Sequence, residues 1–320
     1  RKDCAYPFKE LCGCGVGFKL VQAIESKQSK DNQIINYLDL VALAIAADVV
    51  PLTGENRVLS FIGLQIINSN PRPGVHSLLK KNIKKEYTIS DLMYYVGPRI
   101  NAAGRMKHAS LALELLICND INSVEKLALE IEDLNTSRMD VEKNITSQAI
   151  EQVDNSSEKL SSIVVFGSDW NKGVIGIVAS RLVDKYYKPS IVFCESSKGV
   201  LTASARSIKG LDLYSVLNQC KGFIDQFGGH KYAAGLTIKK ENLEGFKKHF
   251  ENIVSQIIDK NIFEQELLIE SKINLNEITP KFFRILKQFE PFGPGNKSPL
   301  FLSENLKTKG KAFELGKEKE

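Results

Sequence analysis

The segment from residue 123 to residue 153 constrains the fold of this chain most, because it contains neither proline nor glycine. Its spacing of apolar residues predicts one long helix, and most faces of that helix are polar. A helix of this kind often connects two domains. We therefore expect one folded part before this segment and a different one after it.

The part before the long helix is predicted to be mostly helical. Apolar residues recur at helical spacing in several segments, and the turn formers of residues 68–74 predict a loop. Ser90 precedes another apolar run and is a credible N-cap. The predicted helices cover residues 16–24, 38–50, 57–67 and 110–117.

After residue 160 the pattern changes to short apolar runs that alternate with helical segments, which predicts an α/β domain. From about residue 264 the pattern changes again and resembles the start of a small β domain. The predicted strands are 162–166, 190–194, 200–207, 233–238 and 299–302, and the predicted helices are 173–187, 211–220, 243–258 and 280–288.

Composition excludes several classes of protein. With 43% hydrophobic and 25% charged residues, the 320-residue chain is neither mainly disordered nor collagen-like, and its length suggests two domains and part of a third. No apolar run reaches the ~18 residues of a membrane span. The net charge of +5 permits binding to a polyanion without demanding it. Six cysteines in a chain that needs no disulfides favour a cytoplasmic location.

Asp48 is the first candidate functional residue. It lies among apolar residues at a predicted helix end, and a buried carboxylate needs a partner or a cation. A hard divalent metal would suit this oxygen ligand. The alternative is a carboxylate that caps the backbone or pairs with an arginine such as Arg57.

Two further segments suggest phosphate binding. Arg99, Asn101 and Arg105 lie in a glycine-containing segment, where the guanidinium groups suit phosphate unless they only form surface salt bridges. Ser204 and Arg206 share one face of a predicted strand and would clamp a phosphate, or else face solvent.

Glycines mark the remaining candidates. Gly228 and Gly229 free the backbone before His230 in a glycine-rich loop, although a lone histidine is often structural. The 173–176 segment opens a helix after a strand, where glycines either cradle phosphate or permit close packing.

Taken in order, these segments resemble the RecJ single-stranded-DNA exonucleases of the DHH phosphoesterase superfamily. The matching stretches span nearly the whole chain. They are residues 11–19, 47–52, 97–105, 170–180, 204–206, 227–230 and 292–296.

The resemblance implies a two-metal phosphodiesterase, using Mn²⁺ or Mg²⁺, that degrades single-stranded DNA from the 5′ end in recombination and repair. Asp48 matches a metal-ligand aspartate of the family, and Ser204 and Arg206 match its 5′-phosphate-binding strand. Gly228, Gly229 and His230 match its glycine-rich substrate loop, with His230 also expected to be catalytic. Arg99, Asn101 and Arg105 match a motif that faces the cleft, so we expect phosphate contacts there.

The family order implies an architecture for this chain. We expect the rear of a DHH catalytic domain at 1–118, a connecting helix at 119–155, a DHH-associated α/β domain at 156–262 and the start of an OB-like β domain at 263–320. The family's Asp-His-His triplet is absent from these residues and is expected before Arg1. Alone, the chain is therefore expected to be inactive.

Other interpretations stay open at this point. One is a DHH-family phosphodiesterase of oligonucleotides or nucleotides, and another is a non-catalytic single-strand-binding relative. The resemblance also implies a monomer that acts with a helicase and a single-strand-binding protein and has no membrane association.

Overall fold

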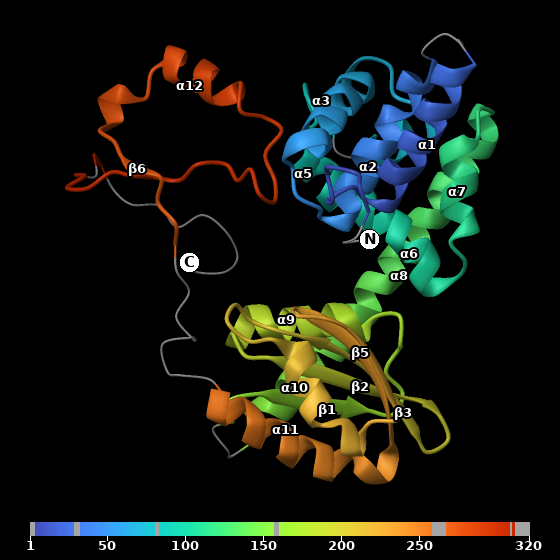
Figure 1. The fold of residues 1–320 in the computed structure, drawn as a ribbon, viewed down its shortest axis with the longest axis vertical. Helices are drawn as coiled ribbons and strands as arrows, with labels where there is room; N and C mark the ends of the chain where they lie inside the picture. Colours follow the sequence, from blue (N-terminus) through green and yellow to red (C-terminus); the bar gives the residue numbers. More distant parts are fainter. Residues whose placement is uncertain are drawn as a thin grey trace. The chain divides into compact units, whose positions relative to one another are not determined.

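The computed structural model describes residues 4–28, 33–80, 83–156, 160–257, 267–307 and 309–310. The chain divides into two compact units, which are described separately (Figure 1). Unit 1 comprises residues 1–97 and 266–320, and unit 2 comprises residues 98–265.

Unit 1 is built around a helix that is apolar on all sides. This helix, α2 (Leu38–Asp48), includes Val41, Ala42 and Ile45, which are at most 1% exposed. A helix of this character must be surrounded by other elements. The others of the first part are α1 (Gly13–Lys27), η1 (Gln33–Tyr37), α3 (Gly54–Ser69), α4 (Pro73–Leu79), α5 (Ile89–Asp91) and η2 (Leu92–Val96).

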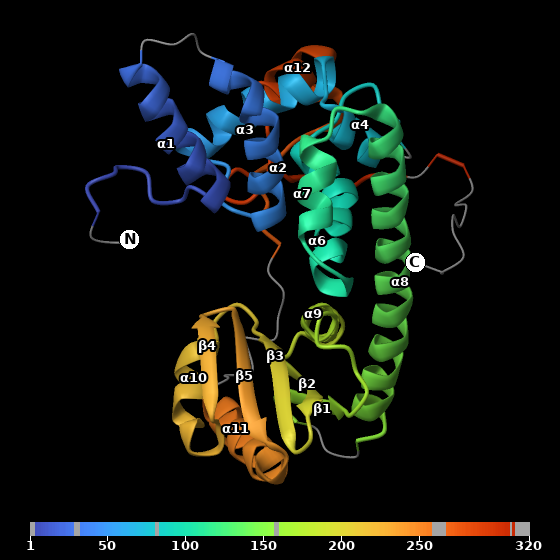
Figure 2. The ribbon, with the colours of Figure 1, turned by 90° about the vertical axis from the view of Figure 1, so that its right-hand side faces the viewer.

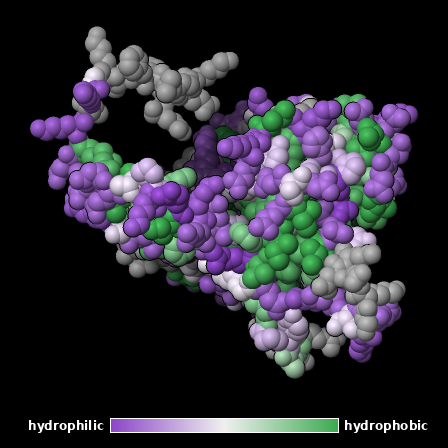
Figure 3. Space-filling model, turned by 90° about the horizontal axis from the view of Figure 1, so that it is seen from above, coloured by the Kyte–Doolittle hydropathy of each residue, from purple (hydrophilic) through white to green (hydrophobic). Residues whose placement is uncertain are grey.

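A glycine allows α3 to pack tightly on α2. A Cβ atom at Gly63 would lie 2.2 Å from the carbonyl oxygen of Leu38. The outer helix α1 is less enclosed, and Val16, Leu20 and Ile24 are about half exposed or more. Apolar patches among polar ones are visible on the face shown in Figure 3.

The cap of α5 differs from the prediction, which placed it at Ser90. The N-cap is Thr88, whose hydroxyl accepts a hydrogen bond from the Asp91 backbone amide at 3.3 Å. The Asp91 carboxylate accepts one from the Thr88 amide at 2.9 Å in return. This reciprocal capping box satisfies two backbone donors. Ser90 therefore lies inside the first turn.

The C-terminal part of unit 1 packs against the segment that follows α2. It contains β6 (Ser271–Lys272), η6 (Leu275–Glu277), α12 (Pro280–Lys287) and β7 (Phe301–Leu302), which pairs in parallel with β6. The Leu52 amide donates to the Pro294 carbonyl at 2.6 Å. A Cβ atom at Gly293 would lie 2.4 Å from Cδ1 of Leu52, which is fully buried. The 291–296 loop is thus fitted onto Leu52.

We expect Gly293→Val to destabilise unit 1 by about 1–3 kcal/mol, since the added side chain overpacks the site of Leu52. Urea unfolding followed by fluorescence measures the change in the free energy of unfolding. Lys297→Ala, at an exposed position of the same loop region, serves as the control. Equal stability of the two variants would contradict the packing described here.

Unit 2 begins with helices, and the long helix predicted from the sequence is confirmed. The first helices of this unit are α6 (Gly97–Met106) and α7 (Ser110–Ile117). The predicted long helix is α8 (Ile121–Asp154), which is 34 residues long. The Asp120 carboxylate caps α8 by accepting from the Ser123 amide at 2.8 Å. In the part of the chain that the structure describes, no helix has both the length and the apolar character needed to cross a membrane.

The rest of unit 2 is a five-stranded mixed sheet with the helices that cover it. The strand order is β1-β2-β3-β5-β4 (Figure 2). Only β1 and β2 are parallel, and α9 connects them. The elements are β1 (Ile163–Gly167), α9 (Ile175–Tyr186), β2 (Ser190–Ser197), β3 (Val200–Arg206), α10 (Leu213–Gln219), η3 (Lys221–Phe223), β4 (Gln226–His230), β5 (Ala233–Lys239), η4 (Lys240–Asn242) and α11 (Leu243–Ile257).

The alternation of residues along β3 decides which side chains reach which face of the sheet. Leu201, Ala203 and Ala205 are buried in the core that includes residues of α10 and α11. Successive side chains of a strand point to opposite faces. Ser204 and Arg206 therefore project from the other face, which α9 covers (Figure 2).

One predicted loop is a strand. Residues 227–230 were expected to form a glycine-rich loop, but they belong to the edge strand β4, which pairs with β5. Gly229 has a φ of 154°, and a Cβ atom there would lie 2.3 Å from the Ala233 carbonyl oxygen. The glycines thus allow two backbones to approach closely.

Candidate functional site

Ser204 and Arg206 form the centre of the candidate site. Arg206 donates from Nη1 to the Ser204 hydroxyl at 3.0 Å and to the Ala205 carbonyl at 2.9 Å. Both side chains are half-buried. Desolvation lowers the pKa of Arg206, and the positive charge of Arg105 lowers it further. The guanidinium thus has neutral hydrogen-bond acceptors and a like charge nearby.

Arg105 reaches this centre from α6. It donates from Nη1 to the Gly173 carbonyl at 2.8 Å. Desolvation lowers its pKa first, and the charge of Arg138 lowers it further, while Glu142 acts in the opposite direction. Within the described residues, no carboxylate forms an ion pair with Arg105 or Arg206. Two arginines therefore lie close together without a paired acid.

Gly176, in the first turn of α9, lies against the face of β3 that carries Ser204 and Arg206. A Cβ atom at this position would lie 3.0 Å from the Ser204 hydroxyl oxygen and 3.2 Å from Nη2 of Arg206. The helix N-terminus also favours negative charge. We call Arg105, Gly176, Ser204 and Arg206 the Arg–Ser cluster.

The loop before α9 is anchored at both ends. Buried Trp170 donates from Nε1 to the Gln148 side chain on α8 at 2.7 Å. The Asn171 side chain accepts from the Gly173 amide at 2.7 Å. Gly173 also lies against α6, because a Cβ atom there would be 2.6 Å from the Arg105 carbonyl oxygen. These contacts fix the loop that positions Gly176.

The strand register extends the site across the sheet. Ser204 lies opposite Gly235 of β5, which lies opposite Gly228 of β4. Directly paired residues of antiparallel strands face the same way, and neighbouring strands are about 4.8 Å apart. Beyond Ser204, towards β4, this line of paired residues consists of glycines, which carry no side chain.

His230 belongs to another line of residues that are paired across β3, β5 and β4. Arg206 lies opposite Ala233, which lies opposite His230. The His230 ring is exposed, and its Nδ1 lies 3.3 Å from the Tyr232 backbone amide. His230 thus shares a face with Arg206 at two strand spacings, or about 10 Å.

Two predicted phosphate contacts lie elsewhere. Arg99 is paired with Glu132 of α8, with Nε and Oε2 at 2.6 Å, so the salt-bridge alternative describes it. Asn101 is exposed on α6. Of the three residues predicted in this segment, the structure brings only Arg105 to the Arg–Ser cluster.

Asp48 is exposed, which differs from the expected buried carboxylate. It is the last residue of α2, and Val49 follows in a left-handed conformation with a φ of 55°. The alternative partner Arg57 instead donates to the carbonyls of Gln288 and Glu290 at 3.1 and 3.3 Å. Asp48 is therefore free to accept a ligand from solvent.

The surroundings of Asp48 do not complete a metal site. Among the described residues, no group of three or more His, Cys, Asp or Glu side chains is arranged to hold a metal ion. Cys12 and Cys14 lie near enough for the charge of Asp48 to raise their thiol pKa values, after the larger effect of desolvation. A carboxylate with two protonated thiols is a poor set for Mn²⁺ or Mg²⁺. Asp48 fits as one hard-oxygen ligand only.

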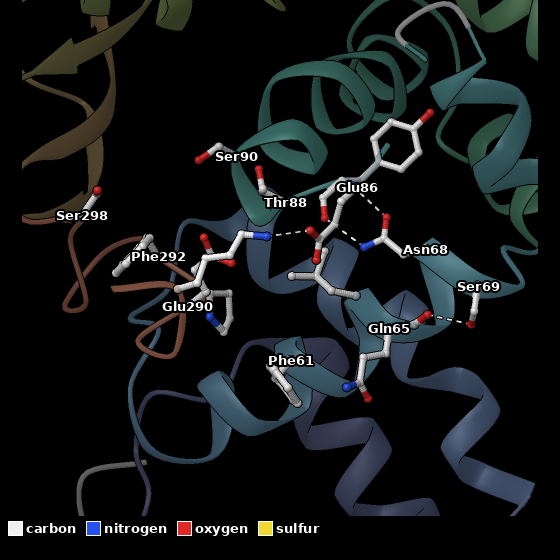
Figure 4. A pocket seen from close by; sticks show the side chains of 14 residues that line it. Phe61, Gln65, Asn68, Ser69, Glu86, Thr88, Ser90, Glu290, Phe292 and Ser298 are labelled. Atoms are coloured by element: carbon white, nitrogen blue, oxygen red, sulfur yellow. Dashed lines mark hydrogen bonds and ion pairs between the residues drawn. The ribbon is translucent and has the colours of Figure 1, made fainter. Parts of the chain in front are cut away.

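Unit 1 also contains a cavity of about 870 Å³ that no sequence motif indicated (Figure 4). It is lined by parts of α3, the 86–90 segment and the 287–298 region. Lys287 pairs with Glu86 at 2.8 Å, and Asn68 exchanges hydrogen bonds with the Tyr87 backbone. The lining also includes Glu290, so the cavity has no excess of positive charge, unlike the Arg–Ser cluster.

Comparisons with known proteins show which families the chain resembles. The DHHA1 domain family matches residues 159–256, and the RecJ OB domain family matches residues 269–320. The Bacillus subtilis single-stranded-DNA-specific exonuclease RecJ is 36% identical over 315 residues, which cover 95% of this chain and 38% of that protein.

Solved structures give the same result. The crystal structure of RecJ in complex with Mn²⁺ from Thermus thermophilus has a TM-score of 0.83 and 29% identity, covering 92% of this chain and 44% of that one. The complex of the same protein with Mg²⁺ has a TM-score of 0.83 and 28% identity, covering 93% and 46%. The chain thus spans less than half the length of these two relatives.

The fold defines a DHH-associated α/β domain, which contains the Arg–Ser cluster and is joined in the chain to helical and OB-type segments. The chain belongs to the RecJ family. The fold class expected from the sequence is confirmed. The individual domain limits and the roles of the site residues stay predictions.

Proposed function

We propose that the full-length protein is a single-stranded-DNA exonuclease that works from the 5′ end, and that this chain binds the terminal phosphate. One observation carries the proposal: Arg206 donates to the Ser204 hydroxyl, the charge of Arg105 is near enough to lower the pKa of Arg206, and neither arginine forms an ion pair within the described residues. A phosphate dianion would supply the missing negative charge. The names of the RecJ relatives and their Mn²⁺ and Mg²⁺ complexes support the substrate and the metal requirement.

The residues of the cluster have distinct tasks in this proposal. The guanidinium groups of Arg105 and Arg206 bind phosphate oxygens, as charge-assisted hydrogen bonds of this kind are short and strong. The Ser204 hydroxyl adds a donor, and Gly176 lets the backbone of α9 approach Ser204 and Arg206 closely. The small residues of β5 and β4 let the single-stranded DNA approach the sheet. His230 contacts the DNA farther from its 5′ end.

The metal chemistry concerns other parts of the protein. Divalent ions activate a water molecule and stabilise the charge that develops on the phosphodiester. Within this chain, Asp48 would hold such an ion, together with ligands outside the described residues.

We expect Gly176→Leu to weaken recognition of the 5′ phosphate, because the added side chain fills the space beside Ser204 and Arg206. The KM for a 5′-phosphorylated strand should rise about 10- to 100-fold. This change corresponds to the binding free energy of one or two charge-assisted hydrogen bonds. Steady-state kinetics with 5′-phosphoryl and 5′-hydroxyl oligonucleotides measure it.

Gly222→Leu is the matched control, since a Cβ atom there meets nothing within 4 Å. It should leave both KM values unchanged. If Gly176→Leu also leaves them unchanged, the Arg–Ser cluster is not the phosphate site.

The two alternatives raised by the sequence receive no support of their own. The relatives carry the name of a single-stranded-DNA-specific exonuclease, which favours neither a nucleotide phosphodiesterase nor a non-catalytic binding protein. Product sizes released from a long single strand test this choice.

We also propose, from family resemblance, that a monomer acts in the cytoplasm beside a helicase and a single-strand-binding protein. Co-purification of tagged full-length protein from cells tests these partners.

A further inference from the structure

The chain leaves α2 through a left-handed turn directly after Asp48. Val49 has a φ of 55° and a ψ of 35°, which is an outlier for a β-branched residue, and glycine usually takes this conformation at the end of a helix. The Val49 side chain is 52% exposed, so its own packing does little to offset the cost. A strained residue of this kind persists only where its surroundings impose the conformation.

Asn56 holds the chain just beyond this turn. Its side chain is fully buried and donates from Nδ2 to the main-chain carbonyls of Pro51 at 3.0 Å and Glu10 at 2.6 Å. The segment that leaves α2 is thereby tied to the segment that leads into α1. Oδ1 of Asn56 is also buried, and it accepts no hydrogen bond from the described residues. An orphaned amide oxygen costs stability, so the two donations favour a positional role over a purely stabilising one.

The 291–296 loop holds the same stretch of chain. The Leu52 amide donates to the Pro294 carbonyl at 2.6 Å, and a Cβ atom at Gly293 would lie 2.4 Å from Cδ1 of Leu52. A Cβ atom at Gly295 would lie 3.4 Å from Cβ of Pro51. Residues 51 and 52 are therefore fixed both by hydrogen bonds and by close packing.

The placement of Asp48 depends on this turn because Asp48 is the last residue of α2. The final carbonyl groups of a helix have no partner within it, and helix ends fray. A side chain that binds a metal ion together with other ligands must be held to within about 0.5 Å. The position of the Asp48 carboxylate is thus set by how the chain is held after it.

We propose that Asn56 is a positioning residue for the metal ligand Asp48. Together with the 291–296 loop, it imposes the left-handed turn at Val49, and this turn fixes the end of α2 that carries the carboxylate. The inference rests on the proposed function, in which Asp48 holds a divalent ion. It also gives the OB-type segment that contains the 291–296 loop a task at the metal site.

The test is the affinity of the full-length protein for Mn²⁺, measured by calorimetry in the absence of DNA. Asn56→Leu removes both donations at similar side-chain volume, so the turn at Val49 should relax to a conformation with negative φ. The affinity should fall about tenfold, which corresponds to the cost of the left-handed conformation. The rate of single-turnover cleavage below saturating Mn²⁺ should fall with it.

The substitution Val49→Gly should rescue this loss, because glycine adopts positive φ without the steric cost. In Asn56→Leu/Val49→Gly the affinity for Mn²⁺ should return to within about threefold of the wild type. A merely structural role of Asn56 predicts no rescue by a change at an exposed position. Asn68→Leu is the matched control and should leave the affinity unchanged. It removes an exposed asparagine of the same helix that also donates to a main-chain carbonyl, that of Tyr87 at 3.0 Å.

Val49→Pro tests the inference independently of how Asn56→Leu folds. Proline excludes positive φ at this exposed position, so the affinity for Mn²⁺ should fall about tenfold even with Asn56 in place. Wild-type affinity in folded Asn56→Leu or in Val49→Pro overturns the inference, and so does a double variant as deficient as Asn56→Leu. Wild-type affinity in Asp48→Ala would instead overturn the proposed role of Asp48 itself.

Discussion

Replacing Asp48 by alanine in the full-length protein is expected to lower the rate of single-strand cleavage by about three orders of magnitude. Its carboxylate is exposed at the end of α2 and has no arginine partner among the described residues. A bound metal ion contributes several kcal/mol to stabilising the transition state, and about 1.4 kcal/mol corresponds to tenfold in rate. Single-turnover cleavage at saturating Mn²⁺ measures the effect.

Glu10→Ala is the control for Asp48→Ala, because it removes an exposed carboxylate elsewhere in unit 1. It should cleave at the wild-type rate. Binding of Mn²⁺ measured by calorimetry adds a readout apart from activity, and Asp48→Ala should bind the ion more weakly. Near-normal cleavage by Asp48→Ala would refute its role as a metal ligand.

The second large effect is expected for Arg206→Ala. Losing this guanidinium should raise the KM for a 5′-phosphorylated strand about 10- to 100-fold, since a hydrogen bond to a charged group is worth about 1.5–3 kcal/mol. The turnover number should change less, and a 5′-hydroxyl strand should be affected little. Steady-state kinetics with the two strands give the ratio.

Lys198→Ala removes an exposed positive charge from the turn between β2 and β3 and tests for general electrostatic attraction. Long-range attraction is screened by salt, so both variants should be compared at two salt concentrations. If Arg206→Ala and Lys198→Ala behave alike, Arg206 has no specific role in phosphate recognition.

Much of unit 2 was predictable because its patterns are local. The absence of proline and glycine between residues 123 and 153 indicated α8, and the alternation along β3 placed Ser204 and Arg206 on one face. These predictions depend on the period of a single segment. They needed no knowledge of how distant segments pack.

The errors arose where distant contacts decide the outcome. The glycine pair in β4 suggested a loop, but its pairing with β5 makes it a strand. Arg99 and Arg105 looked equivalent, yet Glu132 on α8 engages the first and leaves the second for the cluster.

The alternation of β3 also limits how this strand can change during evolution. Inserting or deleting one residue before Ser204 would turn Ser204 and Arg206 into the apolar core and bring Ala203 or Ala205 to the face of α9. A change of length by one residue would need a β-bulge to keep both faces as they are. We therefore expect related sequences to differ in length at the turns that flank β3 and not within it.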